Sequence, residues 1–247
     1  RIMIKVNWDE FAQLGSLRSV LDPKDQWNFK NRLIDAIQWE GLKRYMSPGT
    51  KLLDFGCGTG RFSSRISAMK IDYIGIDSSV GMIEKAHGLN PLNIYINFDG
   101  LSIPCKDNEF DTVISCGVFQ YIIGQDECEK VVREIVRVLK PGAIILLLEQ
   151  ASLSQSMSGT VNRSSTELDY INILSEHFKV ESIDRIRSCE MPQLSYFSFR
   201  IAKRLPYIFP WFLNRLASNE VKMYKKMNEE YYKTIKYYDF LLKAVVR

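Results

Sequence analysis

The chain lacks several features that would place it in a membrane or outside the cell. Its longest run of apolar residues, 143–148, is far too short to span a bilayer. No secretory signal is visible at its start, and its five cysteines include no C-x-x-C pair. An odd number of cysteines without metal-ligand spacing is typical of free thiols in a reducing compartment. We therefore expect a cytoplasmic protein.

Histidine and net charge are also limited. The two histidines, His87 and His177, stand at positions more typical of structural or surface residues than of a catalytic base, and we predict no metal site. The net charge is +4, but residues 200–247 hold eleven Lys or Arg against four Asp or Glu. The rest of the chain is therefore slightly acidic, which argues against a nucleic-acid partner for the core.

What the sequence does contain is a glycine-rich turn between an apolar strand and a helix-like segment. In LLDFGCGTG, residues 52–60, Gly56, Gly58 and Gly60 stand at every second position. Glycine permits positive φ and close approach of a ligand to the main chain, and the helix N-terminus that follows attracts an anionic group. The turn predicts a nucleotide-like cofactor site; a tight turn without a ligand is the alternative.

A second acidic residue favours the cofactor. Asp77 ends the segment IGID, about 20 residues after the turn, where a ribose-binding carboxylate is expected. The dinucleotide fingerprint G-x-G-x-x-G does not fit, because the spacing here is D-x-G-x-G-x-G beginning at Asp54. An acid at that position suits a ligand with a cationic group better than a pyrophosphate. S-adenosylmethionine has an ammonium, a carboxylate and a ribose diol.

Four ordered segments carry a resemblance to a known family. They are LLDFGCGTGRFS, IGIDSSVGMIEKA, FDGLSIPCKDNEFDTVISCGVFQYI and EIVRVLKPGAIILLLE. Over residues 50–204 the chain resembles the class I S-adenosylmethionine-dependent methyltransferases, in particular the ubiquinone-biosynthesis type, or type 11, group. The resemblance implies S-adenosylmethionine as the cofactor and methyl transfer as the activity.

Strands that alternate with helices predict an α/β fold with an open, doubly wound sheet. Short apolar segments typical of buried parallel strands are 51–55, 73–77, 93–98, 112–116 and 143–149. The helices between them are 61–69, 80–87 and 127–139. By the resemblance, 180–186 and 196–202 complete a Rossmann-like, seven-stranded, mostly parallel sheet with the last strand antiparallel.

Two segments flank this core. Residues 1–49 are expected to be an N-terminal helical segment, 50–204 the S-adenosylmethionine-binding methyltransferase core, and 205–247 a C-terminal helical extension. Apolar residues at helical spacing predict a long helix over 221–245. The favoured interpretation is a helix packed on the core or on a partner subunit. The alternative is an aromatic and basic surface on an anionic membrane or over the acceptor. A homodimer and a peripheral membrane contact stay open.

Three sets of residues are expected to hold the cofactor. The methionine moiety is expected at the glycine turn and at two strand ends, namely Asp54, Gly56, Cys57, Gly58, Gly60 and Cys116. The ribose is expected at Asp77 and Ser78. By the resemblance, the adenine is expected beside Met82, Asp99, Gly100 and Leu101. In that set Asp99 would accept from the exocyclic amine and Leu101 would donate its backbone N–H.

The acceptor side is less well defined. Displacement at a sulfonium mainly requires alignment, and a base is needed only where the nucleophile holds its proton firmly. Many relatives carry a histidine after the fourth strand, where this chain has Gln120 and Tyr121. The catalytic candidates are therefore Tyr121 and Glu149, which ends the fifth strand. A solvated strand-end acid is an equally good interpretation of Glu149.

We expect an S-adenosylmethionine-dependent methyltransferase that acts on a non-polymeric acceptor: a small molecule, a sugar or a lipid-linked metabolite. O-methylation is slightly favoured over N-methylation, and no nucleic acid is expected as a partner. The alternative is a non-catalytic S-adenosylmethionine-binding regulatory or assembly protein, which the missing histidine and the C-terminal extension motivate. A nicotinamide-dependent dehydrogenase would need phosphate-binding spacing that the turn lacks.

Overall fold

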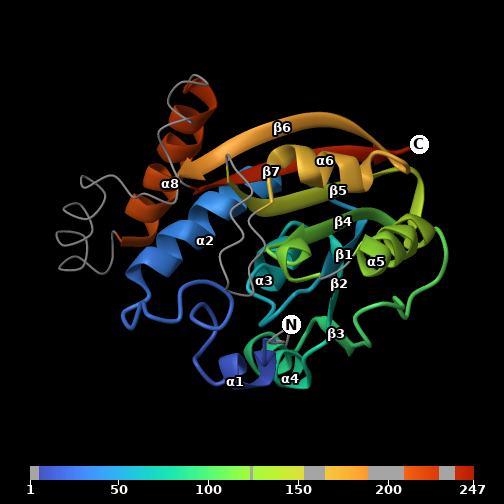
Figure 1. Cartoon of the computed structure of the whole chain (residues 1–247). Helices are drawn as coiled ribbons and strands as arrows, with labels where there is room; N and C mark the ends of the chain where they lie inside the picture. Colours follow the sequence, from blue (N-terminus) through green and yellow to red (C-terminus); the bar gives the residue numbers. More distant parts are fainter. Residues whose placement is uncertain (1–5, 123–124, 153–164, 189–208, 228–236) are drawn as a thin grey trace, which may run out of the picture.

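A seven-stranded sheet organises the protein (Figure 1). The structure is a computed structural model and describes residues 6–122, 125–152, 165–188, 209–227 and 237–247. The strand order is β3-β2-β1-β4-β5-β7-β6. The strands are β1 (Lys51–Phe55), β2 (Asp72–Asp77), β3 (Ile94–Asn97), β4 (Phe110–Cys116), β5 (Leu139–Ser152), β6 (Phe178–Ser188) and β7 (Tyr237–Val246). Strands β1 to β5 pair in parallel, and β7 runs antiparallel to both β5 and β6. The predicted fold class is confirmed.

Helices cover both faces of the sheet (Figure 1). They are α1 (Trp8–Ala12), α2 (Phe29–Leu42), α3 (Ser63–Ala68), α4 (Val80–Leu89), α5 (Gln125–Val138), α6 (Glu167–Leu174) and α8 (Phe209–Lys226), with 3-10 turns η1 (Lys43–Tyr45) and η2 (Phe119–Tyr121). Helices α5 and α6 pack on one face with Leu53 of β1, and α2, α3, α4 and α8 pack on the other with Leu52. Because both faces are buried, β1 is apolar on successive residues and does not alternate.

Local sequence signals place the helix starts near the site. The Ser79 side chain accepts a hydrogen bond from the Met82 N–H, so a serine caps the start of α4. In the N-terminal segment, the Asp25 carboxylate accepts from the Asn31 N–H in the first turn of α2. Trp27 precedes α2 and is 71% exposed.

The C-terminal strand corrects the prediction for the end of the chain. The expected helix over 221–245 is wrong for its second half, because residues from Tyr237 onward form β7. This strand lies between β5 and β6 and pairs with both, which explains why Phe240, Leu241 and Leu242 are all buried. The segment 196–202, expected to be the last strand, lies outside the described residues. The sheet thus continues past residue 204, the predicted end of the core.

Helix α8 packs on the body of the protein. Its buried residues Leu213, Ala217 and Val221 belong to the apolar cluster that also contains Leu33 of α2. Packing on the core, the favoured interpretation of the extension, is therefore confirmed for α8. The membrane interpretation, an aromatic and basic surface in this extension, stays a prediction, and the second half of the helix expected there is the strand β7.

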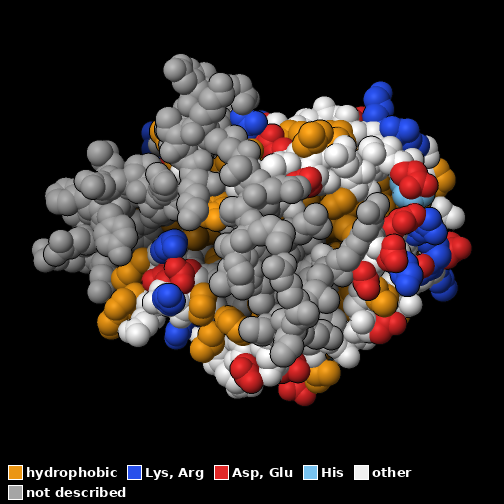
Figure 2. All heavy atoms as spheres, in the orientation of Figure 1, with side chains coloured by type: hydrophobic (Ala, Val, Ile, Leu, Met, Phe, Trp, Pro, Cys, Tyr) orange, Lys and Arg blue, Asp and Glu red, His pale blue; other side chains and the backbone are white. Residues whose placement is uncertain are grey.

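Acidic and basic side chains are interleaved on the face shown in Figure 2, around α5. Ion pairs in this region join Arg133 to Glu129, Arg137 to Glu134, and Lys140 to Asp111. In the described part of the chain, no helix is long and apolar enough to cross a bilayer.

Candidate active site

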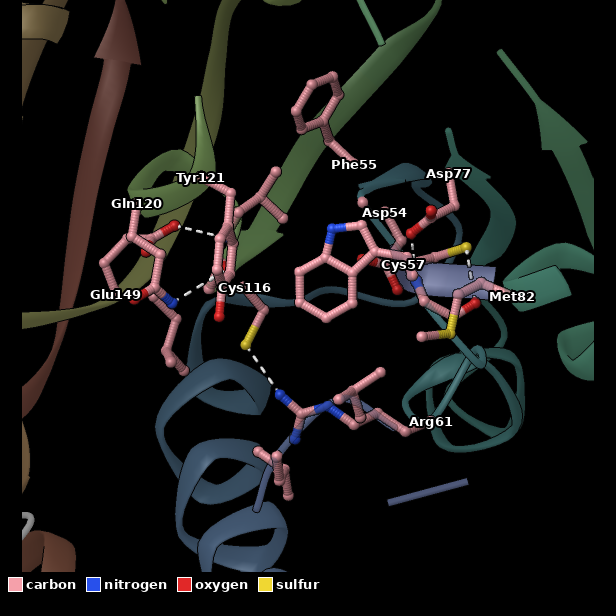
Figure 3. A pocket seen from close by; sticks show the side chains of 18 of the residues that line it. Asp54, Phe55, Cys57, Arg61, Asp77, Met82, Cys116, Gln120, Tyr121 and Glu149 are labelled. Carbon is pink, nitrogen blue, oxygen red and sulfur yellow. Dashed lines mark hydrogen bonds between the residues drawn. The ribbon is translucent and has the colours of Figure 1, made fainter. Parts of the chain in front are cut away.

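One cavity of about 560 Å³ lies at the carboxyl ends of the parallel strands, and this volume suits a small ligand. Strands β1, β2, β4 and β5 supply Asp54, Asp77, Cys116 and Glu149 to its wall. Figure 3 shows Asp54, Asp77 and Met82 on one side, with Gln120, Tyr121 and Glu149 on the other. Ligands bind at this edge of open α/β sheets, where helices leave opposite faces. The cavity therefore joins the predicted cofactor residues to both catalytic candidates.

The glycine turn requires glycine for two reasons: its backbone has positive φ, and there is no room for a side chain. Gly56 and Gly58 have φ of 71° and 54°, and both line the cavity. A Cβ on Gly56 would lie 2.4 Å from a Val118 methyl group, and one on Gly58 would lie 2.6 Å from a Val20 methyl group. The backbone N–H groups of Gly56 and Cys57 both donate to the carbonyl of Ile76. The turn is thus tied to β2, and these two N–H groups already have an internal partner.

Gly60 lies beneath the turn. Its φ is 66°, and a Cβ there would meet the Tyr95 hydroxyl at 2.7 Å. It is not among the residues that line the cavity. A direct role of Gly60 in cofactor binding stays a prediction, whereas its role in shaping the turn is visible in the packing.

Asp77 is held by two backbone groups. Its Oδ2 accepts from the Gly58 N–H at 2.8 Å, and its Oδ1 accepts from the Ser79 N–H at 2.9 Å. Burial raises the pKa of this carboxyl, against the lowering effect of these bonds. Because each oxygen has a second lone pair, both can still accept from a ligand diol. Asp77 and the adjacent Ser78 line the cavity, in keeping with the predicted ribose site.

Asp54 is a buried acid at the methionine end of the predicted cofactor site. It is 3% exposed, and its Oδ2 accepts from the Tyr73 hydroxyl at 2.9 Å. Burial raises the pKa of Asp54 to about 7, although the Tyr73 bond and the Arg61 charge oppose the shift. A cationic ligand group next to this carboxylate would favour its charged form.

Of the four residues predicted to bind the adenine, two line the cavity and two do not. Met82 is 2% exposed and lines the wall together with Gly100. Asp99 is exposed, and its Oδ1 accepts from the N–H groups of Leu101 and Ser102 at 2.8 and 2.7 Å. Neither Asp99 nor Leu101 lines the cavity, so their contacts with the adenine stay predictions.

Arg61 is a functional candidate that the sequence analysis missed. Its Nη2 donates to Gln38 Oε1 at 2.8 Å and lies 2.9 Å from Cys116 Sγ (Figure 3). Its Nη1 donates to Asp35 at 3.0 Å, and the side chain is 8% exposed. Burial raises the pKa of the Cys116 thiol to about 12, so this sulfur is a neutral thiol. The position of Arg61 directly after the glycine turn was the available signal.

A buried polar wall continues from Gln38 to the end of the sheet. Gln38 Nε2 donates to Asp239 Oδ2 at 3.0 Å, and Arg187 binds both oxygens of Asp239 at 2.8 and 3.0 Å. Gln38, Arg187 and Asp239 are 6%, 7% and 3% exposed, and all three line the cavity. They come from α2, β6 and β7, so no local motif could have revealed them.

Glu149 differs from the solvated strand-end acid that was its alternative interpretation. It is 1% exposed, and its Oε1 accepts from the N–H groups of Val118 and Phe119 at 2.8 and 2.9 Å. Its Oε2 is buried and has no hydrogen-bond partner among the described residues. Burial raises the pKa of Glu149 to about 8, against the lowering effect of the backbone bonds and with a further increase from the charge of Asp239.

The N-terminal segment covers one side of the cavity. The Trp8 ring meets the Tyr121 ring edge to face at 4.9 Å, and both residues line the wall. Asp9 accepts from the Ser79 hydroxyl and the Gly81 N–H at the start of α4, which anchors α1 there. Tyr121 is thus placed by a contact far away in sequence.

Comparisons with known proteins agree with this architecture. A family model described as "Methyltransferase domain" matches residues 53–147. The 2-methyl-6-phytyl-1,4-hydroquinone methyltransferase of Synechocystis sp. is 31% identical over 155 residues, which cover 60% of this chain and 46% of that protein. Over residues 53–147 the chain thus matches the type 11 group of S-adenosylmethionine-dependent methyltransferase domains.

Two further proteins show the range of this similarity. The tRNA (carboxymethyluridine(34)-5-O)-methyltransferase of Saccharomyces cerevisiae is 35% identical over 104 residues, which cover 40% of this chain and 37% of that protein. The crystal structure of geranyl diphosphate C-methyltransferase from Streptomyces coelicolor with S-adenosyl-L-homocysteine has a TM-score of 0.60 at 14% identity. It covers 91% of this chain and 82% of that one. The chain spans less than half the length of both curated relatives.

The matched part of this methyltransferase domain ends within β5. Asp54, Asp77 and Cys116 lie inside it. Arg187 and Asp239, which complete the polar wall of the cavity, lie outside it. The family model therefore covers the predicted cofactor residues Asp54, Asp77 and Cys116 but does not extend to Arg187 and Asp239.

Proposed function

We propose that this chain transfers a methyl group from S-adenosylmethionine to a non-polymeric acceptor. The observation that carries the proposal is that one cavity has Asp54 and Asp77 on one side and Glu149 and Tyr121 on the other. When bound, S-adenosylmethionine supplies an electrophilic methyl group on a sulfonium. Asp77 would hold the ribose diol, and Asp54 would hold the ammonium. The buried polar wall formed by Gln38, Arg187 and Asp239 would fix the direction from which the acceptor approaches.

We infer that Glu149 is the general base for this reaction. Its unpartnered Oε2 can take a proton while the N–H groups of Val118 and Phe119 hold Oε1 in place. A pKa of about 8 is close to that of an efficient base at neutral pH. A hydroxyl acceptor needs such a base, whereas a neutral amine does not. This contrast supports O-methylation over N-methylation. Tyr121 would contribute its ring, and its hydroxyl if the acceptor reaches it.

The proposed acceptor is a small molecule, a sugar or a lipid-linked metabolite. The name of the Synechocystis relative gives it a hydroquinone acceptor, which carries ring hydroxyl groups. The yeast relative is named for a tRNA, so nucleic acid is the acceptor to compare against. The interleaved charges around α5 favour the small molecule. Neither a membrane contact nor a homodimer belongs to this proposal, because no feature of the described residues requires one.

The test is a transfer assay with methyl-labelled donor and separate pools of acceptors: phenols and hydroquinones, polar hydroxylated metabolites, amines, and bulk tRNA. Label in an O-methyl product, with transfer lost in Glu149→Gln at a saturating concentration of the donor, would support the proposal. Donor and product binding without transfer to any pool would instead support the non-catalytic alternative. Label in tRNA alone would contradict the small-molecule proposal.

A further inference from the structure

The acids that line the cavity fall into two groups. Asp22 pairs with Lys30, and Asp239 pairs with Arg187. Asp54, Asp77 and Glu149 form no ion pair among the described residues. The hydrogen bonds that they accept come from a phenol hydroxyl and from backbone N–H groups.

The nearby cations form no ion pair with these three acids, although the charge of Arg61 lowers the pKa of Asp54. Arg61 is in ion-pair contact with Asp35, and Arg187 is in ion-pair contact with Asp239. A buried carboxylate without a cation is costly unless a charged partner arrives. The cavity is therefore complementary to a ligand that carries net positive charge.

The two forms of the proposed cofactor differ in that property. Both carry an ammonium and a carboxylate, but only the methyl donor carries a sulfonium; the spent product has a neutral thioether. The donor thus has one more positive charge than the product. The charge of Glu149 in a buried, low-dielectric wall can distinguish the two, because Coulomb interactions weaken less there than in water.

We propose that Glu149 makes the cavity select the charged methyl donor over the neutral spent product, and that donor binding drives a proton off this carboxyl. The proposal rests on the proposed function, since it takes S-adenosylmethionine as the ligand. The balance is simple: the neutral carboxyl loses its proton to solvent, and the carboxylate left behind faces the sulfonium. The product brings no such charge, so the carboxyl keeps its proton.

The groups around Glu149 are compatible with loss of its proton when the donor binds. Asp239 of β7 raises its pKa, the phenol of Tyr170 of α6 stays neutral because burial raises its pKa, and Cys116 of β4 is a neutral thiol. The N–H groups of η2 act in the opposite direction. With a pKa of about 8, Glu149 is largely protonated at neutral pH before the cation binds.

Asp54 faces different groups and should behave differently. Arg61 lowers its pKa, whereas Asp77 raises it, and Tyr73 donates to it. Its expected partner, the ammonium, is present in both the donor and the product. Asp54→Asn should therefore weaken binding of both ligands alike, which makes it the internal comparison for Glu149.

The experiment is calorimetric titration of the full chain with S-adenosylmethionine, S-adenosylhomocysteine and an analogue in which an ammonium group replaces the methylsulfonium. Titrations at pH 6.5 and 8.5, in two buffers of different ionisation enthalpy, give the Kd and the number of protons released. We expect the donor-to-product affinity ratio to rise about tenfold for each unit by which the cation lowers the Glu149 pKa. Proton release should accompany the donor and the analogue and should be absent for the product.

Two variants test whether Glu149 causes the pH dependence of the donor-to-product affinity ratio. Glu149→Gln should remove the pH dependence of the ratio, while Glu127→Gln, which removes one exposed charge on α5, should leave it intact. Equal pH dependence for donor and product in the unmodified protein would overturn the inference, and this comparison needs no variant. Persistence of the ratio change in a folded Glu149→Gln would overturn it too. If neither ligand binds at all, the proposed function itself fails.

Discussion

The two sides of the cavity are built in different ways. The side of the cavity proposed to bind the cofactor, here called the cofactor side, consists of Asp54, the glycine turn, Asp77 and Met82. These residues lie within a short stretch of sequence on β1, β2 and α4. The acceptor side combines Gln38 of α2 with Glu149, Arg187 and Asp239 from the last three strands of the sheet. The cofactor side requires only one strand-turn-helix unit and the neighbouring strand and helix. The acceptor side exists only when the whole sheet has formed.

This difference extends to the chemistry of each side. The cofactor side uses backbone groups and single acids, such as the two N–H groups that hold Asp77. The acceptor side uses a hydrogen-bonded chain of side chains from three elements. A buried ionic chain of this kind stabilises a fold poorly compared with apolar packing. Its presence along the cavity is better explained by recognition of a polar acceptor group.

The largest expected effect comes from removing β7. Deleting residues 237–247 takes out the strand between β5 and β6, and the backbone edges of both neighbours lose their hydrogen-bond partners. The truncated chain should fail to form a soluble, cooperatively folded protein. Circular dichroism melts and size-exclusion chromatography check this. A folded truncated protein that still binds the donor would show that the cofactor side stands alone, contrary to the fold described here.

The next effect concerns the ion pair of the acceptor wall. Asp239→Asn leaves the buried guanidinium of Arg187 without its carboxylate, and such a loss costs about 3–5 kcal/mol. Urea unfolding should show this loss of stability. The matched control is Lys243→Ala on the same strand, whose partly exposed pair with Glu181 should contribute about 1 kcal/mol or less. Similar losses in both variants would contradict a special role for the buried pair.

On the cofactor side, Asp77→Ala should act on affinity more than on folding. The lost carboxylate accepts two backbone bonds and is expected to accept two more from the ribose. Each bond to a charged group contributes about 1.5–3 kcal/mol. Donor affinity should fall by tenfold or more in calorimetry. Asp72→Ala, at the exposed start of the same strand, is the control and should leave affinity unchanged. Unchanged affinity in Asp77→Ala would exclude Asp77 from the cofactor site.

A pH-dependent effect on stability separates Glu149 from ordinary acids. Between its ordinary pKa of 4.5 and its folded value of about 8, the unfolded chain ionises Glu149 while the folded chain keeps it protonated. The folded state binds more protons in this window, so stability falls as pH rises through it, by up to about 1.4 kcal/mol per pH unit. Glu149→Gln should therefore gain stability over the unmodified protein between pH 5 and 8. Urea unfolding across that range would refute the shift if the difference stayed constant.

Much of this molecule follows from local sequence signals. The alternation of strands and helices predicted β1 to β5 within a few residues, because buried parallel strands are short apolar runs between turn residues. The same signals located the glycine turn and Asp77. These features depend on residues near one another in sequence.

Tertiary structure decided the rest. The residues of β7 carry apolar side chains at a spacing that fits a helix, but pairing with β5 and β6 buries them as a strand. Arg187 and Asp239 meet across two strands of this late part of the sheet, and Trp8 reaches Tyr121 from the other end of the chain. No spacing rule links positions so far apart. The candidate acceptor site was therefore visible in the sequence only as Glu149 and Tyr121.

The smallest effect tests the contact between the N-terminal segment and the cofactor side. Asp9 joins α1 to α4 by accepting from the Ser79 hydroxyl at 2.6 Å and the Gly81 N–H at 2.8 Å. Asp9→Ala should free α1, and with it Trp8, which lines the cavity against Tyr121. Donor dissociation, followed by tryptophan fluorescence in stopped flow, should become several-fold faster without a change in secondary structure. Glu10→Ala is the control, because the one hydrogen bond that its carboxylate accepts within the described part of the chain comes from Asn7 of the same segment. Equal dissociation rates in the two variants would mean that α1 covers the cavity without retaining its ligand.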